Sequence, residues 1–346
     1  MGQAISRVPR SIRLFRITEC DSESYNNEAP RLNRQEGKQP LLNWLDPFRT
    51  PRNHSVSPVE PRVINTRVIN GAALAARLRA ELAASVARLV ASGIRPGLAA
   101  VEVGDHPGSR IYVRNKIKAC AEAGLHSEHV ALPASIAEGA LLERIAELNA
   151  SPAIHGILVQ LPLPDHIAAA HILEAVAPAK DVDCFHPENV GRLAAGTPRF
   201  IPCTPAGVLT ILETEGLNPW AKHAVVVGAS NVVGKPLALL LLQKGATVTI
   251  CNSKTPDIAA HTARADILVT AVGRPKLVNG TMVKPGAAVI DVGISRLPDG
   301  KLAGDCDFQS LLGVASIATP VPGGVGPMTI TMLLANTVRA AEAHAR

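Results

Sequence analysis

Apolar residues recur with helical and strand periods along most of this chain. Leucine and valine return every three or four positions between residues 72 and 91, which predicts a helix with one apolar face. The segment 98–103 predicts a strand. Beyond it we expect a helix from Ser109 to Gly124, a strand at 129–132, a helix at 137–149 and a strand at 154–159. Strands that alternate with helices predict a parallel sheet covered on both faces.

A second alternating region begins near Pro202. It predicts helices at 205–215, 233–243 and 256–263, and strands at 224–227, 246–251, 266–271 and 287–292. A last helix at 328–344 is expected to pack back on the first domain. The predicted fold class is α/β with two lobes: an N-terminal α/β domain (63–200 plus the C-terminal helix, 328–346) and a Rossmann-like domain (201–327).

Residues 1–62 show no lasting apolar period and are rich in arginine, asparagine, proline, serine and glutamate. We expect a disordered extension. Its first eighteen residues carry four arginines and no acid, which loosely resembles a mitochondrial presequence, and the first six fit a myristoylation pattern. We favour an extension without function.

Composition narrows the function classes. The 346 residues are 47% hydrophobic but only 3% aromatic, so the core must be aliphatic. The net charge of +6 is spread along the chain without a basic, aromatic-rich block, so no nucleic-acid partner is expected. No apolar run reaches eighteen residues, and no membrane partner is expected. Six scattered cysteines without a C-x-x-C pair suit a reducing cytosol, and no metal site is indicated.

The segment 320–329 restricts the backbone conformation more than any other segment of the chain. It holds three prolines and three glycines among ten residues, which fixes a backbone shape. Glycine also lets a ligand approach the main chain. Pro327 stands where the first turn of the last helix could begin. An ordinary loop that caps a helix is the alternative interpretation.

A glycine turn follows the strand predicted at 224–227. It reads G-x-S-x-x-x-G, with Gly228, Ser230 and Gly234, and differs from the dinucleotide fingerprint G-x-G-x-x-G. Gly228 permits a tight turn, Gly234 permits close packing of the helix, and free N–H groups at the helix start favour a phosphate. The next strand ends in Asn252-Ser-Lys-Thr255. Because this strand end has no acid to bind a ribose hydroxyl, it favours NADP over NAD.

Five polar residues of the first lobe are candidates for chemistry. Tyr112 and Lys116 are four residues apart on one face of the predicted helix, a pair suited to proton transfer if the lysine's surroundings favour it. Gln160 ends a buried strand and needs hydrogen-bond partners. Of Asp181 and Asp183, one could face the ligand while the other braces the loop. A half-buried tyrosine, an exposed lysine, a satisfied amide and a solvated acidic turn are the alternatives.

Together these segments resemble the bifunctional methylenetetrahydrofolate dehydrogenase/methenyltetrahydrofolate cyclohydrolase family, the FolD type. The resemblance covers residues 66 to 340 and appears in seven segments in the family's order. They are Tyr112–Lys116, Gly156–Pro164, Lys180–Asp183, Pro202–Pro205, Gly228–Pro236, Asp291–Ile294 and Pro320–Thr329.

The resemblance implies oxidation of 5,10-methylenetetrahydrofolate with NADP, then hydrolysis of the methenyl cation to 10-formyltetrahydrofolate. Lys116 would be the acid/base group, Tyr112 would orient substrate, Gln160 would tune the lysine and Asp183 would hold the pterin. The implied folate contacts are Tyr112, Val159, Gln160, Leu161, Asp183, Pro322, Gly323 and Gly324. The implied cofactor contacts are Gly228, Ala229, Ser230, Val233, Gly234, Ser253 and Ile294. The first lobe would be the folate-binding catalytic domain and the second the NADP-binding domain. The resemblance also implies a homodimer and no metal. From the cysteines we expect a cytoplasmic location, with a mitochondrial one as the alternative if the N-terminal extension is a presequence.

Three residues depart from the family pattern. Cys184 stands where glycine is usual and could crowd the folate loop, Asn252 replaces a frequent histidine, and Ala229 a frequent arginine. A silent folate- or nucleotide-binding protein and a monofunctional enzyme are therefore the alternatives. A short-chain dehydrogenase is rejected, because there the tyrosine–lysine pair follows the glycine turn, whereas here it precedes that turn by more than a hundred residues.

Overall fold

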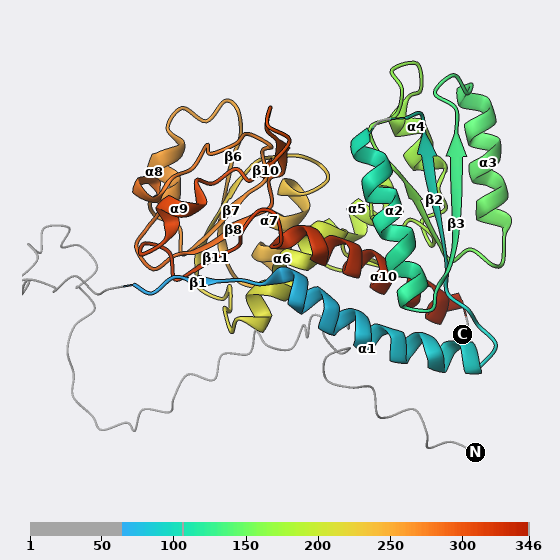
Figure 1. Cartoon of the computed structure of the whole chain (residues 1–346), viewed down its shortest axis with the longest axis horizontal. Coiled ribbons are helices and arrows are strands. Elements are labelled where there is room, and N and C mark those ends of the chain that lie inside the picture. The colour runs from blue at the N-terminus through green and yellow to red at the C-terminus, as the bar shows by residue number, and fades with distance from the viewer. Residues whose placement is uncertain (1–63, 106, 345–346) are drawn as a thin grey trace, which may run out of the picture. The chain divides into compact units, whose positions relative to one another are not determined.

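Two parallel sheets organise the part of the chain that the structure describes (Figure 1). The structure is a computed structural model that describes residues 64–105 and 107–344, with side chains left out at 107–109. The extension predicted at 1–62 lies outside the described residues.

The first sheet has three parallel strands in the order β3-β2-β4. Alternate residues of its central strand face two different cores. Leu98 and Ala100 pack with side chains of the helices on one face, whereas Ala99 and Val101 pack with those on the other. The sheet is therefore covered on both faces, as predicted. Its strands are β2 (Gly97–Val103), β3 (His126–Leu132) and β4 (Gly156–Val159).

The helices of this lobe follow the predicted pattern with shifted ends. The first begins after Asn70, whose side chain accepts a hydrogen bond from Ala73 N–H (2.9 Å). The second begins at Pro107, two residues before the predicted start at Ser109, since proline suits the first turn of a helix. The helices are α1 (Gly71–Ala91), α2 (Pro107–Glu122), α3 (Glu138–Ala150), and two that were not predicted, α4 (Ala169–Ala175) and α5 (Pro187–Ala194).

The second sheet has six parallel strands in the order β1-β11-β8-β7-β5-β6. Its central strands are short, continuous apolar runs buried on both sides, as is usual in parallel sheets. The strands are β1 (Arg67–Val68), β5 (His223–Val227), β6 (Thr247–Cys251), β7 (Ile267–Thr270), β8 (Ala288–Asp291) and β11 (Ile317–Ala318). The sequence missed β1 and β11, because two residues are too few to show a period.

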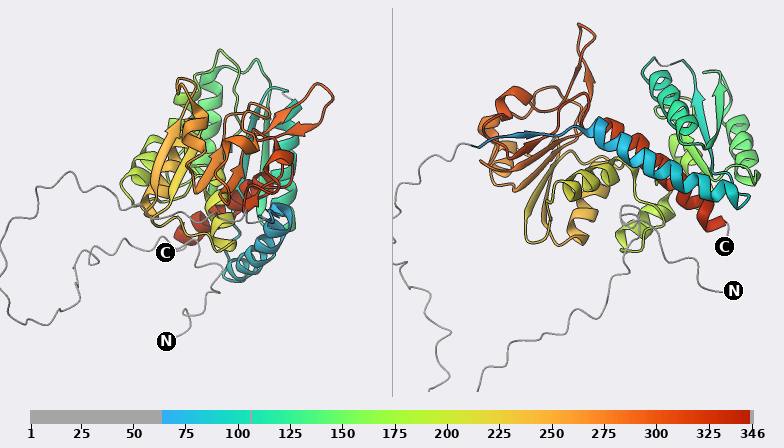
Figure 2. Two further views of the ribbon diagram at one scale, coloured as in Figure 1. Left: turned by 90° about the vertical axis from the view of Figure 1, so that its left-hand side faces the viewer. Right: turned by 60° about the horizontal axis from the view of Figure 1, so that its bottom comes forward.

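Short elements complete this lobe. Helices α6 (Cys203–Thr214), α7 (Gly234–Gln243) and α8 (Ile258–Thr262) agree with the prediction apart from their ends. A 3-10 helix, η2 (Gly280–Met282), and α9 (Phe308–Leu311) were not predicted. Strands β9 (Ser295–Arg296) and β10 (Leu302–Ala303) form an antiparallel hairpin that projects from the second lobe (Figure 2).

The last helix, α10 (Val325–His344), joins the two lobes. It lies beside α1 (Figure 1) and contacts α2, β2 and β4 of the first lobe as well as α6. Its predicted packing on the first domain is thus confirmed. The helix begins two residues before Pro327, so this proline lies inside its first turn, where no hydrogen bond is lost.

Candidate active site

Lys116 and Gln160 are joined by a hydrogen bond across two elements of the first lobe. Lys116 Nζ, on α2, donates to Gln160 Oε1 at 3.1 Å. Gln160 directly follows β4, and its Nε2 donates to the carbonyl oxygen of Leu161 at 2.7 Å. Its main-chain N–H donates to Val101 O of β2 (2.9 Å). Both ends of the amide are therefore engaged, and its oxygen is directed at the lysine.

Tyr112 lies one helical turn before Lys116, as the spacing predicts, with 40% of its surface exposed. Partial burial raises the pKa of its hydroxyl, while the positive charge of Arg296 opposes that change. Arg296 belongs to the β9–β10 hairpin of the other lobe. Tyr112 therefore stays protonated near neutral pH and can donate a hydrogen bond to a ligand.

The two aspartates that follow α4 have different surroundings. Asp181 is buried and accepts hydrogen bonds from the N–H groups of Phe185 and His186 and from Asn189 Nδ2. Burial raises the pKa of its carboxyl, and these three hydrogen bonds oppose the rise. Asp183 is only partly buried. Asp181 therefore braces the loop that carries Asp183.

Cys203, at the start of α6, is a buried thiol near charged groups of this lobe. Burial holds the pKa of its thiol well above the usual range, the charge of Asp183 raises it further, and the charge of Lys116 acts in the opposite direction. The sequence indicated no role for Cys203. Its thiol is affected by the charges of both Asp183 and Lys116, which are 67 residues apart in the sequence.

Cys184 adopts a backbone conformation that favours glycine. Its φ angle is +68°, in the left-handed region. Its side chain is buried, and Sγ donates to the carbonyl oxygen of Phe200 at 3.2 Å. Burial raises the pKa of this thiol far above its ordinary value. The tight turn after Asp183 is therefore kept, with the thiol placed in the core.

The glycine- and proline-rich loop is held by the start of α1. Ala72 N–H donates to Gly323 O at 3.1 Å, and Gly323 has a φ angle of +102°. A Cβ atom on Gly71 would lie 1.8 Å from Gly324 O, so only glycine permits this close approach. Thr329 Oγ1 bonds Thr204 Oγ1 at 3.0 Å, which fixes the far end of the loop to α6.

The glycine turn after β5 leaves no room for a side chain at Gly228 or Gly234. Gly228 has a φ angle of +123°, and a Cβ atom there would lie 2.2 Å from Ala271 O. A Cβ atom on Gly234 would lie 1.9 Å from Gly228 O, so this glycine packs against the turn itself. The expectation of free N–H groups at the start of α7 was wrong in part. Ser230 Oγ accepts from the N–H groups of Val233 (3.1 Å) and Gly234 (3.4 Å).

The predicted cofactor residues follow strands of the second sheet. Gly228 follows β5, Ser253 follows β6 and Ile294 follows β8, and the carboxyl ends of parallel strands meet at one edge of the sheet. Ser253 and Lys254 are exposed, and the turn that carries them is closed by a hydrogen bond from Asn252 N–H to Thr255 Oγ1 (2.9 Å). Glycines without room for a Cβ and an exposed lysine suit the phosphate groups of a dinucleotide.

Asp291, at the end of β8, supports the segment that carries Ile294. Its carboxylate accepts hydrogen bonds from the N–H groups of Gly293 (3.0 Å), Asp305 (3.1 Å) and Cys306 (2.8 Å). Burial raises its pKa to about 6, against the effect of these bonds. The sequence analysis named Asp291 only as part of a family segment. An acid at the end of a buried strand is the signal that could have indicated this bracing role.

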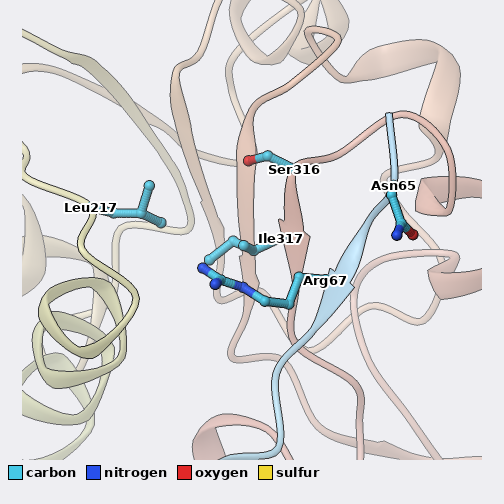
Figure 3. Close-up of a pocket in the computed structure, with 5 residues that line it drawn as sticks. All are labelled: Asn65, Arg67, Leu217, Ser316 and Ile317. Atoms are coloured by element: carbon cyan, nitrogen blue, oxygen red, sulfur yellow. The ribbon is translucent and has the colours of Figure 1, made fainter. Parts of the chain in front are cut away.

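A pocket lies elsewhere on the second lobe (Figure 3). It is lined by Asn65, Arg67, Leu217, Ser316 and Ile317 and therefore lies at the start of β11, away from the carboxyl ends of the strands. It contains none of the predicted site residues. Within residues 64–105 and 107–344, no cluster of three or more metal-ligating side chains is found, and no helix there is long and apolar enough to cross a membrane.

A glycine-turn nucleotide lobe joined to a second α/β lobe is the arrangement typical of nicotinamide-dependent enzymes. Comparison with known proteins is more specific. The family model of the tetrahydrofolate dehydrogenase/cyclohydrolase catalytic domain matches residues 69–183, and that of its NAD(P)-binding domain matches residues 202–345. The chain belongs to the tetrahydrofolate dehydrogenase/cyclohydrolase family.

Relatives and solved structures agree with this assignment. The bifunctional protein FolD of Polynucleobacter asymbioticus is 62% identical over 276 residues, which is 80% of this chain and 97% of the relative. The FolD structure from Campylobacter jejuni is 47% identical with a TM-score of 0.80, over 81% of this chain and 99% of that one. The Trypanosoma brucei FolD complexed with NADP and an inhibitor is 41% identical with a TM-score of 0.79, over 82% and 99%.

The predicted family, fold class, enzyme class and folate substrates are confirmed. NADP is confirmed as the cofactor. The alternative of a silent binding protein is not favoured.

Proposed function

We propose that Lys116 is the acid/base group of the hydrolysis step and that hydride transfer takes place at the same site. The observation that carries this proposal is the hydrogen bond between Lys116 Nζ and Gln160 Oε1. A neutral amide oxygen orients the amino group without a fixed negative charge of its own. Tyr112, on the same helical face, would orient the substrate, and Asp183 would hold the pterin.

The first reaction, hydride transfer, needs little acid/base catalysis from the protein. The carbon that loses hydride lies between two nitrogens, so the substrate itself stabilises the resulting cation. Orientation of the two rings is the main requirement, and NADP supplies the hydride acceptor when bound. We assign the folate contacts to Tyr112, Val159, Gln160, Leu161, Asp183, Pro322, Gly323 and Gly324.

The second reaction needs proton transfer. Water adds to the methenyl carbon, and one carbon–nitrogen bond then breaks to give the formyl product. A group that gives and takes a proton beside that carbon accelerates both events. Lys116 is the candidate, since its amino group is already oriented by Gln160.

We assign the cofactor contacts to the second lobe. They are Gly228, Ala229, Ser230, Val233, Gly234, Ser253 and Ile294. Ser253 and the neighbouring Lys254 would receive the 2′-phosphate, because both are exposed at a strand end that has no acid. We keep the proposed boundaries: a catalytic domain at 63–200 with 328–346, an NADP-binding domain at 201–327, and the extension at 1–62.

The remaining assignments are also proposals. Scattered cysteines without a disulfide pattern support a location in the reducing cytoplasm. We further propose a homodimer, as the family resemblance implies, and no nucleic-acid partner, since the positive charge is not clustered.

The experiment is Lys116→Ala, with Lys118→Ala as the matched control. Both lysines lie on α2, but Lys118 is exposed and forms an ion pair with Glu122. The decay of added methenyltetrahydrofolate is followed by absorbance against a protein-free blank. We expect Lys116→Ala to fold normally and to lose the hydrolysis, whereas Lys118→Ala keeps it. A folded Lys116→Ala enzyme that hydrolyses the substrate at the original rate would remove the lysine from this role.

A further inference from the structure

Asp305 is a fully buried acid of the second lobe, in the segment that follows β10. Its Oδ2 accepts a hydrogen bond from Val272 N–H at 2.6 Å, and its Oδ1 accepts one from Arg274 N–H at 2.7 Å. A buried carboxylate is costly unless hydrogen bonds to its charge offset the loss of water. These two bonds supply that offset, and they tie Asp305 to a turn more than thirty residues earlier in the chain.

The turn at 272–274 directly follows the end of β7 and touches the glycine turn after β5. A Cβ atom on Gly228 would lie 2.2 Å from the carbonyl oxygen of Ala271, so the two turns meet main chain to main chain. Gly273 has a φ angle of +73°, and its carbonyl oxygen accepts a hydrogen bond from Ser295 Oγ at 3.0 Å. The shape of this turn is therefore set by contacts from outside it.

The strand order places both turns at a reversal of the sheet. In the order β1-β11-β8-β7-β5-β6, the chain passes from β5 to β6 on one side and then to β7 on the other side of β5. Ligands of doubly wound sheets bind at such a reversal, in the crevice outside the carboxyl ends of the strands. The glycine turn after β5 and the turn at 272–274 thus border the same crevice.

Asp305 also contacts the segment after β8 that leads to Ile294. A Cβ atom on Gly293 would lie 2.1 Å from Cγ of Asp305, so this segment packs directly against the carboxylate. The N–H groups of Gly293 and Asp305 both donate to Asp291 Oδ1, at 3.0 and 3.1 Å. One buried acid therefore fixes the turn after β7 and packs against the segment after β8.

We propose that Asp305 is a positioning residue for NADP, which holds the turn at 272–274 against the glycine turn and so keeps the crevice between them in its binding shape. Val272 is an apolar residue that stays 38% exposed on this turn, which suits contact with a cofactor. The inference rests on the cofactor contacts proposed above for Gly228 and Ile294. It adds a residue that acts on the cofactor only through the main chain of its neighbours.

The test replaces Asp305 with asparagine, which keeps the shape of the side chain. An amide has one acceptor oxygen, and its NH2 group faces the second N–H without accepting from it, so at most one of the two hydrogen bonds survives in the original arrangement. Asp307→Asn is the matched control. Asp307 lies two residues further along, and its carboxylate pairs with Lys276 Nζ at 3.4 Å.

The primary measurement is the dissociation constant of NADP for the full-length enzyme, by isothermal titration calorimetry. We expect it to rise about tenfold in Asp305→Asn and to stay unchanged in Asp307→Asn, since a displacement of about 1 Å in a positioning segment can cost up to about a hundredfold. The second measurement is the hydrolysis of methenyltetrahydrofolate without NADP. This reaction needs no hydride acceptor, so we expect both variants to keep its rate.

Two results would overturn the inference. One is an unchanged affinity for NADP in a folded Asp305→Asn enzyme, and the other is an equal loss of NADP binding and hydrolysis, which a general loss of structure would cause. If Asp305→Asn does not fold, Gly273→Ala decides instead. A Cβ atom there meets nothing within 4 Å, so alanine strains the turn through its positive φ alone, and unchanged NADP binding would then overturn the inference.

Ser253→Asp separates this inference from the proposed cofactor site. An acid at Ser253 should repel the 2′-phosphate and weaken NADP binding whatever Asp305 does. If Ser253→Asp weakens binding and folded Asp305→Asn does not, the site stands and the role of Asp305 is refuted. If neither variant weakens binding, the proposed site fails, and the inference fails with it.

Discussion

Gly71→Ala tests whether the start of α1 holds the glycine- and proline-rich loop in its active shape. An added Cβ atom would lie 1.8 Å from Gly324 O and 2.6 Å from Gly324 C. Contacts of this kind are essentially never shorter than 3.0 Å, so either the helix start or the loop must move by more than 1 Å. Both partners are main chain, and a rotamer change cannot relieve the clash. The hydrogen bond from Ala72 N–H to Gly323 O is the first to be lost.

The expected cost follows from two opposing terms. Overpacking costs about 1–3 kcal/mol, and alanine recovers up to about 1 kcal/mol through its higher helix propensity. For a chain of this size we expect the melting temperature to fall by roughly 2–6 °C. A displacement of about 1 Å in a substrate-positioning loop can cost up to about a hundredfold in rate. We therefore expect dehydrogenase activity to fall at least about tenfold.

Gly139→Ala is the control for this prediction. Gly139 is the second residue of α3, and a Cβ atom there meets nothing within 4 Å. This variant should gain about 0.5–1 kcal/mol from helix propensity and keep full activity. The assays are thermal unfolding and NADPH formation from 5,10-methylenetetrahydrofolate. If Gly71→Ala matches the wild type in both, the loop does not depend on the close approach, and the reasoning is refuted.

Three further predictions concern single positions. Cys184→Val should destabilise the fold by about 1–3 kcal/mol in chemical denaturation, because a β-branched residue is strained at positive φ, whereas Cys184→Gly should remain within about 1 kcal/mol of the wild type. Glu138→Gln should lower the melting temperature most between pH 4.5 and 6.5. The reason is that the hydrogen bond between Glu138 and His171 lowers the pKa of the glutamate and raises the pKa of the histidine. A decrease in melting temperature that is just as large at pH 8 would contradict this prediction. Ser253→Asp should raise the KM for NADP far more than that for NAD in steady-state assays; equal changes would remove Ser253 from the 2′-phosphate site.

The pH range of the Glu138 prediction follows from the directions of the two pKa shifts. A lowered carboxyl pKa contributes stability above the ordinary value of 4.5 that is lost as the pH falls through the folded-state pKa. A raised histidine pKa contributes stability below the ordinary value of 6.5 that is lost as the pH rises through the folded-state pKa. The two contributions overlap only between these values.

Regular elements were predictable because their signals are local. The stripe of Leu74, Leu78 and Leu82 and the apolar runs of the central strands follow from burial alone. The two-residue strands β1 and β11 were not predictable, because their pairing joins segments about 250 residues apart. The same limit applies to the contact of Gly71 with Gly324, which depends on tertiary packing that no local pattern records.

The candidate site was predictable where the chemistry lies in one segment. Helical spacing placed Tyr112 and Lys116 on one face, but only the tertiary fold brings Gln160 to Lys116. The turn at Cys184 gave a partial signal through the family resemblance, which indicated glycine there. Its +68° φ angle supplies the physical reason for that preference.

The proposed use of one site for both reactions follows from the chemistry of the shared intermediate. The product of hydride transfer is the cation that water attacks next, so the same ring must face the cofactor first and an acid/base group afterwards. A lysine bonded only to an amide oxygen is oriented in both steps. A carboxylate in direct contact would instead hold the lysine permanently as an ion pair and prevent it from accepting a proton.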